Sequence, residues 1–165
     1  MEERLFKEIF LHQNKHWFFA VKKYFFDALL GDLVKRNGSL RVGDVGCGTG
    51  ALFGYLRQFG QVLGLDASGL ALSYASKTSL DEVKLLQAKV DQLPLKANVL
   101  DLACLSDVLY HRDVTSDDQV LKECFRVLRP GGLLILSDSA FKILQSEHDQ
   151  VAHAARRFSA SEIRL

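Results

Sequence analysis

The residues of this sequence best suited to bind a small molecule form a glycine-rich turn followed by one carboxylate. The segment RVGDVGCGTG ends at Gly50, and Asp66 follows at the end of QVLGLD, about twenty residues after Gly46. Glycine has no Cβ, so its main chain can adopt positive φ angles or approach a ligand closely. A helix that begins after such a turn directs unpaired N–H groups at the ligand, and a carboxylate on the next strand can accept hydrogen bonds from a ribose diol. The pattern predicts a nucleotide-type cofactor site.

Two details distinguish this turn from a dinucleotide-binding turn. Gly46, Gly48 and Gly50 have the spacing G-x-G-x-G instead of G-x-G-x-x-G, and Asp44 lies two residues before the first of them. A carboxylate would repel a pyrophosphate but attract an ammonium or a sulfonium. S-adenosylmethionine carries both cations and no phosphate, so the residues favour it. A Rossmann-like domain that binds another nucleotide and a nicotinamide-dependent reductase remain as alternatives.

Four segments of the sequence, in order, resemble the class I S-adenosylmethionine-dependent methyltransferases. DVGCGTG resembles the first motif of that family, and GLDAS resembles its ribose-binding acid. LACLSDVLYH resembles its fourth strand and the following loop, and VLRPGGLLILSDS resembles its helix, turn and fifth strand. The similarity extends over about residues 17–157. It implies an enzyme that transfers a methyl group by in-line displacement to a small-molecule, glycan or lipid-linked acceptor.

The resemblance also implies which residues contact the cofactor. The methionine end would contact Asp44, the turn residues Gly46, Cys47, Gly48 and Gly50, and the backbone of Leu105 and Ser106. The ribose would contact Asp66, and the adenine would lie beside Ala67, Lys89, Val90 and Asp91. Family members often have Gly-Asp-Ala before Leu-Pro, whereas here Lys89 holds the position of the acid and Asp91 comes two places later. Asp91 is therefore either an adenine ligand or a solvated loop acid.

The acceptor site is expected beyond the carboxyl ends of the fourth and fifth strands, as in other open parallel sheets. Asp107 and His111 are the candidate catalytic residues there, with Asp138 after the fifth strand. Imidazole titrates near neutrality, so His111 is the best candidate general base, although a hydrogen-bonded loop histidine without such a role is an equal alternative. The candidate substrate contacts are Trp17, Tyr110, His148, Arg156 and Arg157.

Four of these substrate contacts, Trp17, His148, Arg156 and Arg157, rest on the family resemblance, and Trp17 and the two arginines each have a plain structural alternative. Trp17, with His16, would form part of a lid over the methyl group, or would belong to a helix packed on the sheet. Arg156 and Arg157 would meet a phosphate or carboxylate of the acceptor, or would form a solvated turn. His148 and His153 are five residues apart, a spacing that does not favour a metal site.

Hydrophobic periodicity predicts the elements that position these residues. Helices are expected over about residues 2–35 with a break near Gln13, and over 50–58, 68–76 and 116–128. Strands are expected over 40–45, 62–66, 83–88, 99–105 and 133–137. The N-terminal segment has one apolar face, made by residues that recur at helical steps: Phe6, Phe10, Trp17, Val21, Phe25 and Leu29. The fold class is a Rossmann-like α/β sheet of order 3-2-1-4-5, divided into a helical cap (1–38), a cofactor-binding core (39–138) and an acceptor-side tail (139–165).

The fifth strand is expected to be an open apolar edge, because the two further strands of the family are absent from the sequence. Ser159 to Glu162 has the spacing of a capping box, but only three residues follow it. An exposed strand edge favours pairing with another chain. The sequence therefore predicts either a fragment or a chain whose edge is covered by a second copy or a partner. A module that binds S-adenosylmethionine without catalysis and acts through such a partner is the alternative function.

Composition narrows the remaining classes. The 165 residues carry a net charge of +1 with mixed signs, which gives no general attraction to nucleic acid. The three cysteines, at positions 47, 104 and 124, have no metal-ligand spacing and suggest reduced thiols in the cytoplasm. No apolar run is long enough for a transmembrane helix, and MEER is not a secretory signal, although peripheral membrane contact stays open.

Overall fold

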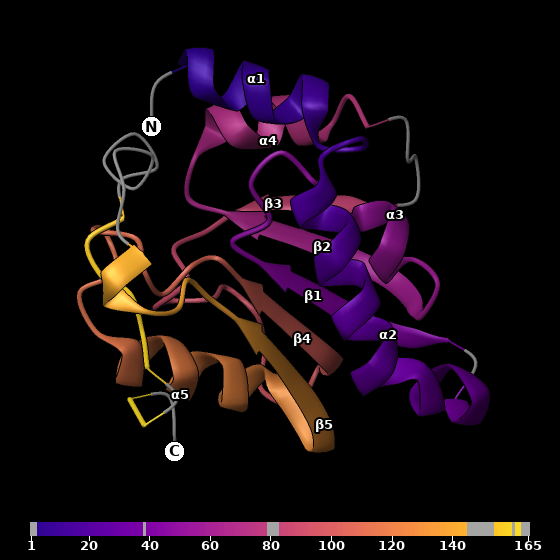
Figure 1. The fold of residues 1–165 in the computed structure, drawn as a ribbon. Coiled ribbons are helices and arrows are strands. Elements are labelled where there is room, and N and C mark those ends of the chain that lie inside the picture. The colour runs from indigo at the N-terminus through magenta and orange to yellow at the C-terminus, as the bar shows by residue number, and fades with distance from the viewer. Residues whose placement is uncertain (1–2, 38, 79–82, 145–153, 160, 163–165) are drawn as a thin grey trace.

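A computed structural model of the chain describes residues 3–37, 39–78, 83–144, 154–159 and 161–162. It contains a parallel sheet with helices on both faces (Figure 1). The helices are α1 (Glu3–His12), α2 (Trp17–Asn37), α3 (Phe53–Leu56), α4 (Gly69–Ala75) and α5 (Asp117–Val127), with the 3-10 helix η1 (Lys142–Leu144). The strands are β1 (Leu40–Val45), β2 (Gly60–Asp66), β3 (Lys84–Gln87), β4 (Leu100–Ser106) and β5 (Leu128–Ser137).

The strand order β3-β2-β1-β4-β5 confirms the predicted topology. β1 lies at the centre and pairs in parallel with both β2 and β4. β2 and β3 follow β1 in the sequence and lie on one side of it, and β4 and β5 lie on its other side. The order therefore reverses between β1 and β4, and the carboxyl ends of these strands form the crevice where open parallel sheets bind ligands.

Alternating side chains of the strands divide the core into two layers. Val42, Leu102 and Ile135 face α2 and α3, where they pack with Phe26, Leu30 and the aromatic residues Phe53, Tyr55 and Phe59. Ala103 and Leu105 face α5 and pack with Val120, Cys124 and Val127. Figure 1 shows α2 and α3 on one side of the sheet and α5 on the other. Because successive strand residues point to opposite faces, the sequence position of a residue decides which helix it meets.

Two elements differ in extent from the sequence prediction. The helix after the glycine turn, expected over 50–58, is limited to α3, and the turns around it use hydrogen bonds of the i to i+3 type. Gly50 and Gly54, both poor helix formers, account for its shortness. β5 begins at Leu128, five residues earlier than expected, and includes the Arg-Pro-Gly-Gly segment. Leu100 pairs with Leu128 and Leu102 with Leu133, so this segment is an irregular excursion within the strand.

The apolar face predicted for the N-terminal helices is largely on the outside of α2. Trp17, Val21, Phe25 and Leu29 are exposed, whereas Phe26 and Leu30 are buried against the sheet. The apolar residues of α2 are spread around the helix together with its charged ones, so periodicity alone does not identify the buried stripe. α1 ends at His12, close to the predicted break, and lies along α4, where the Phe10 and Tyr74 rings are 5.5 Å apart.

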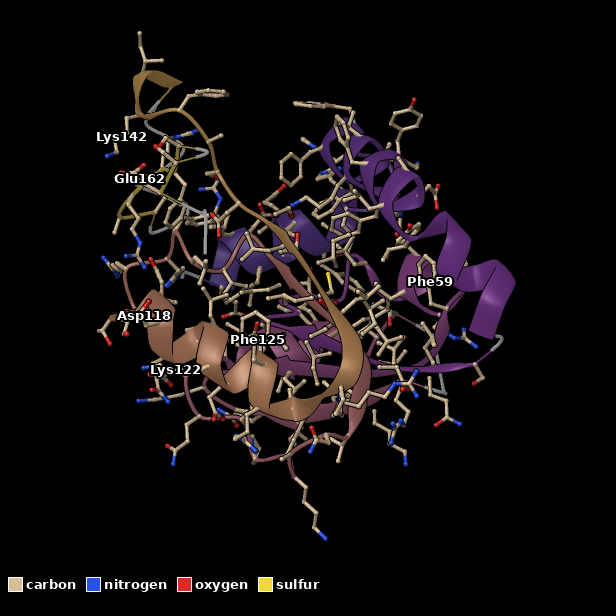
Figure 2. The ribbon with its side chains drawn as sticks, turned by 90° about the horizontal axis from the view of Figure 1, so that it is seen from below. Phe59, Asp118, Lys122, Phe125, Lys142 and Glu162 are labelled. Carbon is tan, nitrogen blue, oxygen red and sulfur yellow. The ribbon has the colours of Figure 1, made fainter. Side chains whose placement is uncertain are left out.

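β5 pairs with β4 on one side, and no strand among the described residues lies along its other side. Leu133 is partly exposed on this strand. One of the two contacts of a capping box is present, since the Ser159 backbone N–H donates to Glu162 Oε2 at 2.7 Å, whereas the Ser159 hydroxyl donates to the same oxygen at 2.8 Å. Glu162 also forms an ion pair of 2.8 Å with Lys142 (Figure 2). Within the described ranges, no helix is both long and apolar enough to cross a bilayer.

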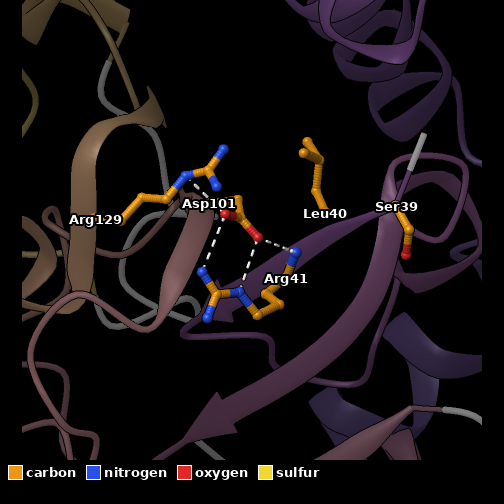
Figure 3. A pocket seen from close by; sticks show the side chains of 5 residues that line it. All are labelled: Ser39, Leu40, Arg41, Asp101 and Arg129. Carbon is orange, nitrogen blue, oxygen red and sulfur yellow. Dashed lines mark hydrogen bonds and ion pairs between the residues drawn. The ribbon is translucent and has the colours of Figure 1, made fainter. Parts of the chain in front are cut away.

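A buried carboxylate ties the amino ends of the central strands together. Asp101 Oδ2 accepts hydrogen bonds from the backbone N–H and the Nε of Arg41, and Asp101 Oδ1 lies 2.8 Å from Arg129 Nε. These residues, with Ser39 and Leu40, line a shallow pocket (Figure 3). The hydrogen bond from the Arg41 guanidinium lowers the pKa of Asp101 below its usual value. The pocket lies at the edge of the sheet opposite the glycine turn, so we regard this cluster as structural.

Replacing Asp101 with Asn should lower the free energy of unfolding at pH 7 by about 1–2 kcal/mol, because two partly exposed guanidinium groups lose their shared carboxylate. Asp101 has a lowered pKa, so its contribution is present above the unfolded pKa of about 4 and is lost as the pH falls through the folded value. Urea unfolding at pH 7 and at pH 3 would test this expectation. A difference between the two proteins that is as large at pH 3 as at pH 7 would contradict it.

Candidate functional site

Strand periodicity places four polar side chains on the α2 side of the sheet at its carboxyl edge. Asp44 has the same parity as Val42, and it pairs in register with Cys104 on β4. Ser106 follows Cys104 by two residues and pairs in register with Ser137 at the end of β5. These four side chains therefore share one face beneath α2. They lie at the carboxyl ends of β1, β4 and β5, where open parallel sheets bind ligands.

Asp44 is the most unusual of these groups. It is 2% exposed, and its Oδ2 has no hydrogen-bond partner among the described residues. Burial, with a smaller effect of the Asp66 charge, raises the pKa of Asp44 to about 7, while the nearby Lys22 charge and a hydrogen bond from Cys104 act against this rise. A buried carboxylate without a partner is costly to ionise. A cationic ligand would stabilise its charged form.

The glycine turn brings the backbone close to this carboxylate. Gly46, Gly48 and Gly50 have φ angles of 77°, 54° and 81°, a region that favours glycine. A Cβ on Gly46 would lie 2.4 Å from a methyl carbon of Val108, whereas nothing lies within 4 Å of a Cβ on Gly48. The backbone N–H groups of Gly46 and Cys47 both donate to Leu65 O, at 2.7 and 2.9 Å. Their N–H groups are thus used to hold the turn against β2.

Asp66, at the carboxyl end of β2, lies directly beside this turn. Its Oδ2 accepts a hydrogen bond of 2.8 Å from the Gly48 N–H, and its Oδ1 accepts one of 2.8 Å from the Ser68 N–H. Ser68 also caps α4, as predicted, since its hydroxyl accepts from the Ala71 N–H. The Asp66 carboxylate is therefore oriented by the loops on both sides, and it remains partly exposed.

The residues predicted to lie beside the adenine follow β3, the neighbour of β2. The Ala88 N–H donates to Asp66 O, which brings the segment after β3 alongside Asp66. Ala67 and Lys89 are exposed, and Val90 and Asp91 are half-buried. Their assignment to the adenine remains a prediction.

Lys22 is the main site residue that the sequence prediction did not assign. It is 8% exposed and enters the carboxyl edge from α2. Its Nζ donates to Ser106 Oγ at 2.8 Å and to Ser137 Oγ at 3.2 Å, and it forms an ion pair with Asp107. Lys22, Phe26 and Leu30 are spaced four residues apart on the buried stripe of α2. A lysine among the buried apolar residues of a helix indicates a functional position. The sequence does not show that Lys22 is such a residue until the buried face of α2 is known.

Gln13, in the turn between α1 and α2, is a second residue that sequence reasoning missed. Its Oε1 accepts a hydrogen bond of 2.6 Å from the Thr49 hydroxyl, in the middle of the glycine turn. Both residues are buried. Of the buried polar residues that the structure describes, Gln13, Lys22, Asp44 and Thr49 lie at this edge of the sheet, and Asp101 lies at the other. The N-terminal helices are thus attached to the core through polar contacts in the candidate cofactor site.

The loop after β4 carries the predicted catalytic residues. Asp107 has a φ of 59°, unusual for a residue other than glycine, and its carboxylate faces Lys22. Asp138, after β5, accepts from the Leu109 N–H at 2.8 Å and holds the loop in place. Burial raises the pKa of Asp138 to about 6. His111 is mostly buried, with Nδ1 3.4 Å from an Asp113 carboxylate oxygen. Its role as a base remains a prediction.

The described part of the tail packs against the same loop. The Ala155 N–H donates to Tyr110 O, and Phe158 is buried beside Ser139 and Phe141. Arg156 donates to Leu109 O at 2.9 Å and forms an ion pair with Asp117, so its guanidinium contacts the protein itself.

The other predicted substrate contacts lie at the margin of the site or beyond the described residues. Arg157 donates to Ala140 O at 3.0 Å. Trp17 is 68% exposed and stacks on His16 at the start of α2. His148 lies outside the described residues. The roles of all these residues in substrate binding remain predictions.

The site fits a ligand that carries a ribose and a cationic end. Asp44 offers a buried oxygen without a partner among the described residues for a cation, Asp66 offers an oriented carboxylate, and no atom would lie within 4 Å of a Cβ on Gly48. A pyrophosphate beside Asp44 and Asp66 would be repelled by both. No group of three or more side chains suited to hold a metal ion occurs within the described residues.

Comparison with known proteins gives a family match at this site. Residues 43–136, more than half of the chain, match the family model described as a methyltransferase domain. This range begins at β1 and ends in β5, so it includes the glycine turn, Asp66 and the loop after β4.

The alignments with individual relatives include most of this chain but only about half of each relative. Malonyl-[acyl-carrier protein] O-methyltransferase from Pectobacterium atrosepticum is 33% identical over 109 residues, which are 66% of this chain and 42% of the relative. Demethylmenaquinone methyltransferase from Staphylococcus aureus is 31% identical over 144 residues, 84% of this chain and 55% of the relative. The crystal structure of an S-adenosylmethionine-dependent methyltransferase from Mesorhizobium loti has a TM-score of 0.59 and 29% identity, over 68% of this chain and 53% of that one. The chain spans about half the length of these proteins.

Replacing Asp44 with Asn should make the ligand-free protein more stable than the parent at pH 8. The difference between the two proteins should be smaller at pH 5. The raised pKa means that the folded protein binds this proton more tightly than the unfolded chain, so stability is present below about pH 4 and is lost as the pH rises to about 7. The full loss for one group shifted from 3.8 to about 7 is up to about 4 kcal/mol. Urea unfolding of both proteins at pH 5 and pH 8 measures the part of this loss that falls above pH 5, about 3 kcal/mol. Parallel pH dependences for the two proteins would show that Asp44 is not held in this state.

Proposed function

The chain belongs to the class I S-adenosylmethionine-dependent methyltransferase family, and from this premise we propose that it transfers a methyl group from S-adenosylmethionine to a small-molecule acceptor. The observation that carries the proposal is the buried, unpaired oxygen of Asp44 beside the glycine turn. A site built for a phosphorylated nucleotide would not present a carboxylate there.

The residues of the carboxyl edge have separate tasks in this proposal. Asp44 would bind the amino group of the cofactor, Asp66 the ribose hydroxyls, and the loop after β3 the adenine. When bound, S-adenosylmethionine supplies a methyl carbon on a cationic sulfur, which leaves with the electrons of the C–S bond. The protein then has to align the acceptor with that carbon and exclude water, which is mainly a matter of positioning.

The acceptor would bind over β4 and β5, on the side of the crevice away from Asp66. The loop after β4 and the tail meet there, through the contacts of Tyr110 with Ala155 and of Leu109 with Arg156. The relatives named for malonyl-[acyl-carrier protein] and demethylmenaquinone support an acceptor that is not a nucleic acid. We propose a small-molecule, glycan or lipid-linked acceptor for this chain.

The outer side of β5 favours a second candidate function. This side has no neighbouring strand in the part of the chain that the structure describes, and Leu133 is partly exposed there. A partner or second copy could pair along it, and the chain would then be a cofactor-binding module of an assembly. Calorimetry with S-adenosylmethionine and a native mass measurement separate the two candidates. A monomer that binds no cofactor would contradict both.

Replacing Asp66 with Ala should weaken binding of S-adenosylmethionine and S-adenosylhomocysteine equally, by about 1.5–3 kcal/mol, because both share the ribose and lose hydrogen bonds to a charged group. Isothermal titration calorimetry measures both affinities. Asp118→Ala, which removes an exposed carboxylate from α5, is the matched control and should bind as the parent does. Unchanged affinity in the Asp66 variant would mean that the ribose binds elsewhere.

Replacing His111 with Ala should leave cofactor affinity unchanged but lower turnover about a hundredfold or more for an acceptor that arrives protonated, the range of general-base catalysis. Turnover is followed as release of S-adenosylhomocysteine across a panel of acceptors. His12→Ala, which alters an exposed histidine on α1, controls for the loss of an imidazole. Equal rates for His111→Ala and the parent would assign His111 to the loop structure alone.

A further inference from the structure

Lys22 is a buried cation whose position in the site has no role in the function proposed above. Its ammonium lies at the carboxyl ends of β4 and β5, between Asp107 and the hydroxyl groups of Ser106 and Ser137. The Phe18 ring lies 4.5 Å from Nζ. A buried ammonium is costly unless charges and hydrogen bonds compensate for it. α2 could fill this space with an apolar side chain, as it does one turn later with Phe26.

Lys22 lies on the same side of the sheet as Asp44. Asp44 and Cys104 are neighbours in register, Ser106 is two residues further along β4, and Lys22 contacts Ser106. The positive charge of Lys22 is near enough to lower the pKa of Asp44 against the effect of burial. Yet the two groups are not paired, because Lys22 bonds to the ends of β4 and β5 and Asp44 Oδ2 has no partner among the described residues. The carboxyl edge of the sheet thus carries one negative and one positive group on the same face, near enough for the charge of Lys22 to act on Asp44.

The partners of Lys22 allow it to accept a new anion. Two of its three partners are neutral hydroxyl groups, which are weaker acceptors than a carboxylate. The Ser106 and Ser137 hydroxyls are 3.1 Å apart, so they remain hydrogen-bonded to each other if Lys22 turns away from either of them. The ion pair with Asp107 holds the ammonium in place. The exchange of a hydroxyl for a carboxylate therefore leaves no polar group unsatisfied.

We propose that Lys22 binds the carboxylate of the cofactor's amino-acid end while Asp44 binds its ammonium. This inference rests on the proposed function, because it assumes that S-adenosylmethionine binds in the crevice. The ammonium and carboxylate of an α-amino acid are attached to one carbon, which matches adjacent positive and negative groups on the protein. Lys22 would select the intact cofactor over nucleosides without the carboxylate. It would also couple α2 to cofactor binding, since the same helix covers the site.

The test compares S-adenosylmethionine with decarboxylated S-adenosylmethionine, which keeps the nucleoside, sulfonium and ammonium. Calorimetry at pH 7.5 should show that the parent protein binds the intact compound at least tenfold more tightly. Lys22→Met should reduce this preference to less than threefold, through weaker binding of the intact compound alone. Lys22→Arg should retain most of the preference. Lys23→Met, which changes the next residue of α2, should behave as the parent does.

Two other outcomes would contradict the inference, and a third would also contradict the proposed function. If Lys22→Met weakens both compounds equally, Lys22 supports the structure of the site and does not recognise the carboxylate. A preference that survives in Lys22→Met likewise overturns the inference. Thermal unfolding of each variant identifies loss of folding. If Lys22→Met does not fold, Lys22→Arg provides the test, because it keeps the charge and should retain most of the preference for the intact compound. If the parent protein binds neither compound, the proposed function fails together with the inference.

Discussion

The constraint on which this site depends is a buried carboxylate, Asp44, one of whose oxygens has no hydrogen-bond partner among the described residues. Asp44 is at the end of the central strand, where the sheet is covered on both faces and water has little access. Its raised pKa reflects an electrostatic cost that the fold alone does not offset. A ligand with a positive charge would remove that cost. The glycine turn, the Asp66 carboxylate and the cap helices are arranged around the space that such a ligand would occupy.

Asp101 provides an internal comparison at the other end of the same strands. It is also a buried aspartate, but Arg41 and Arg129 neutralise it, and its pKa is lowered where that of Asp44 is raised. Asp44 is the more deeply buried of the two, and burial is the main cause of its raised pKa. At Asp101, which lines a pocket, the hydrogen bond from Arg41 outweighs the effect of burial and lowers the pKa. A perturbed group that lacks its counter-charge is the better marker of a binding site.

The sequence was sufficient to predict the sheet order, the glycine turn and the positions of Asp44 and Asp66. These features depend on local rules, namely strand periodicity, glycine at positive φ and the connections of parallel strands. The buried stripe of α2 was not predictable, because apolar residues occur on all sides of the helix and tertiary contacts select the face. The start of β5 was missed for a similar reason, since an Arg-Pro-Gly-Gly segment reads as a turn even where its ends pair with β4.

The same distinction explains why the contacts from the N-terminal helices were missed and why the acceptor is not determined. Lys22 and Ser137 are 115 positions apart, and Gln13 and Thr49 are 36 apart, so their contacts arise only when α1 and α2 dock on the sheet. The cofactor side is formed by strand ends, whose geometry the sheet fixes. The acceptor side is formed by the loop after β4 and the tail, whose side chains determine shape and charge without a regular pattern. Specificity for the acceptor therefore resides in the part of the fold that secondary-structure rules constrain least.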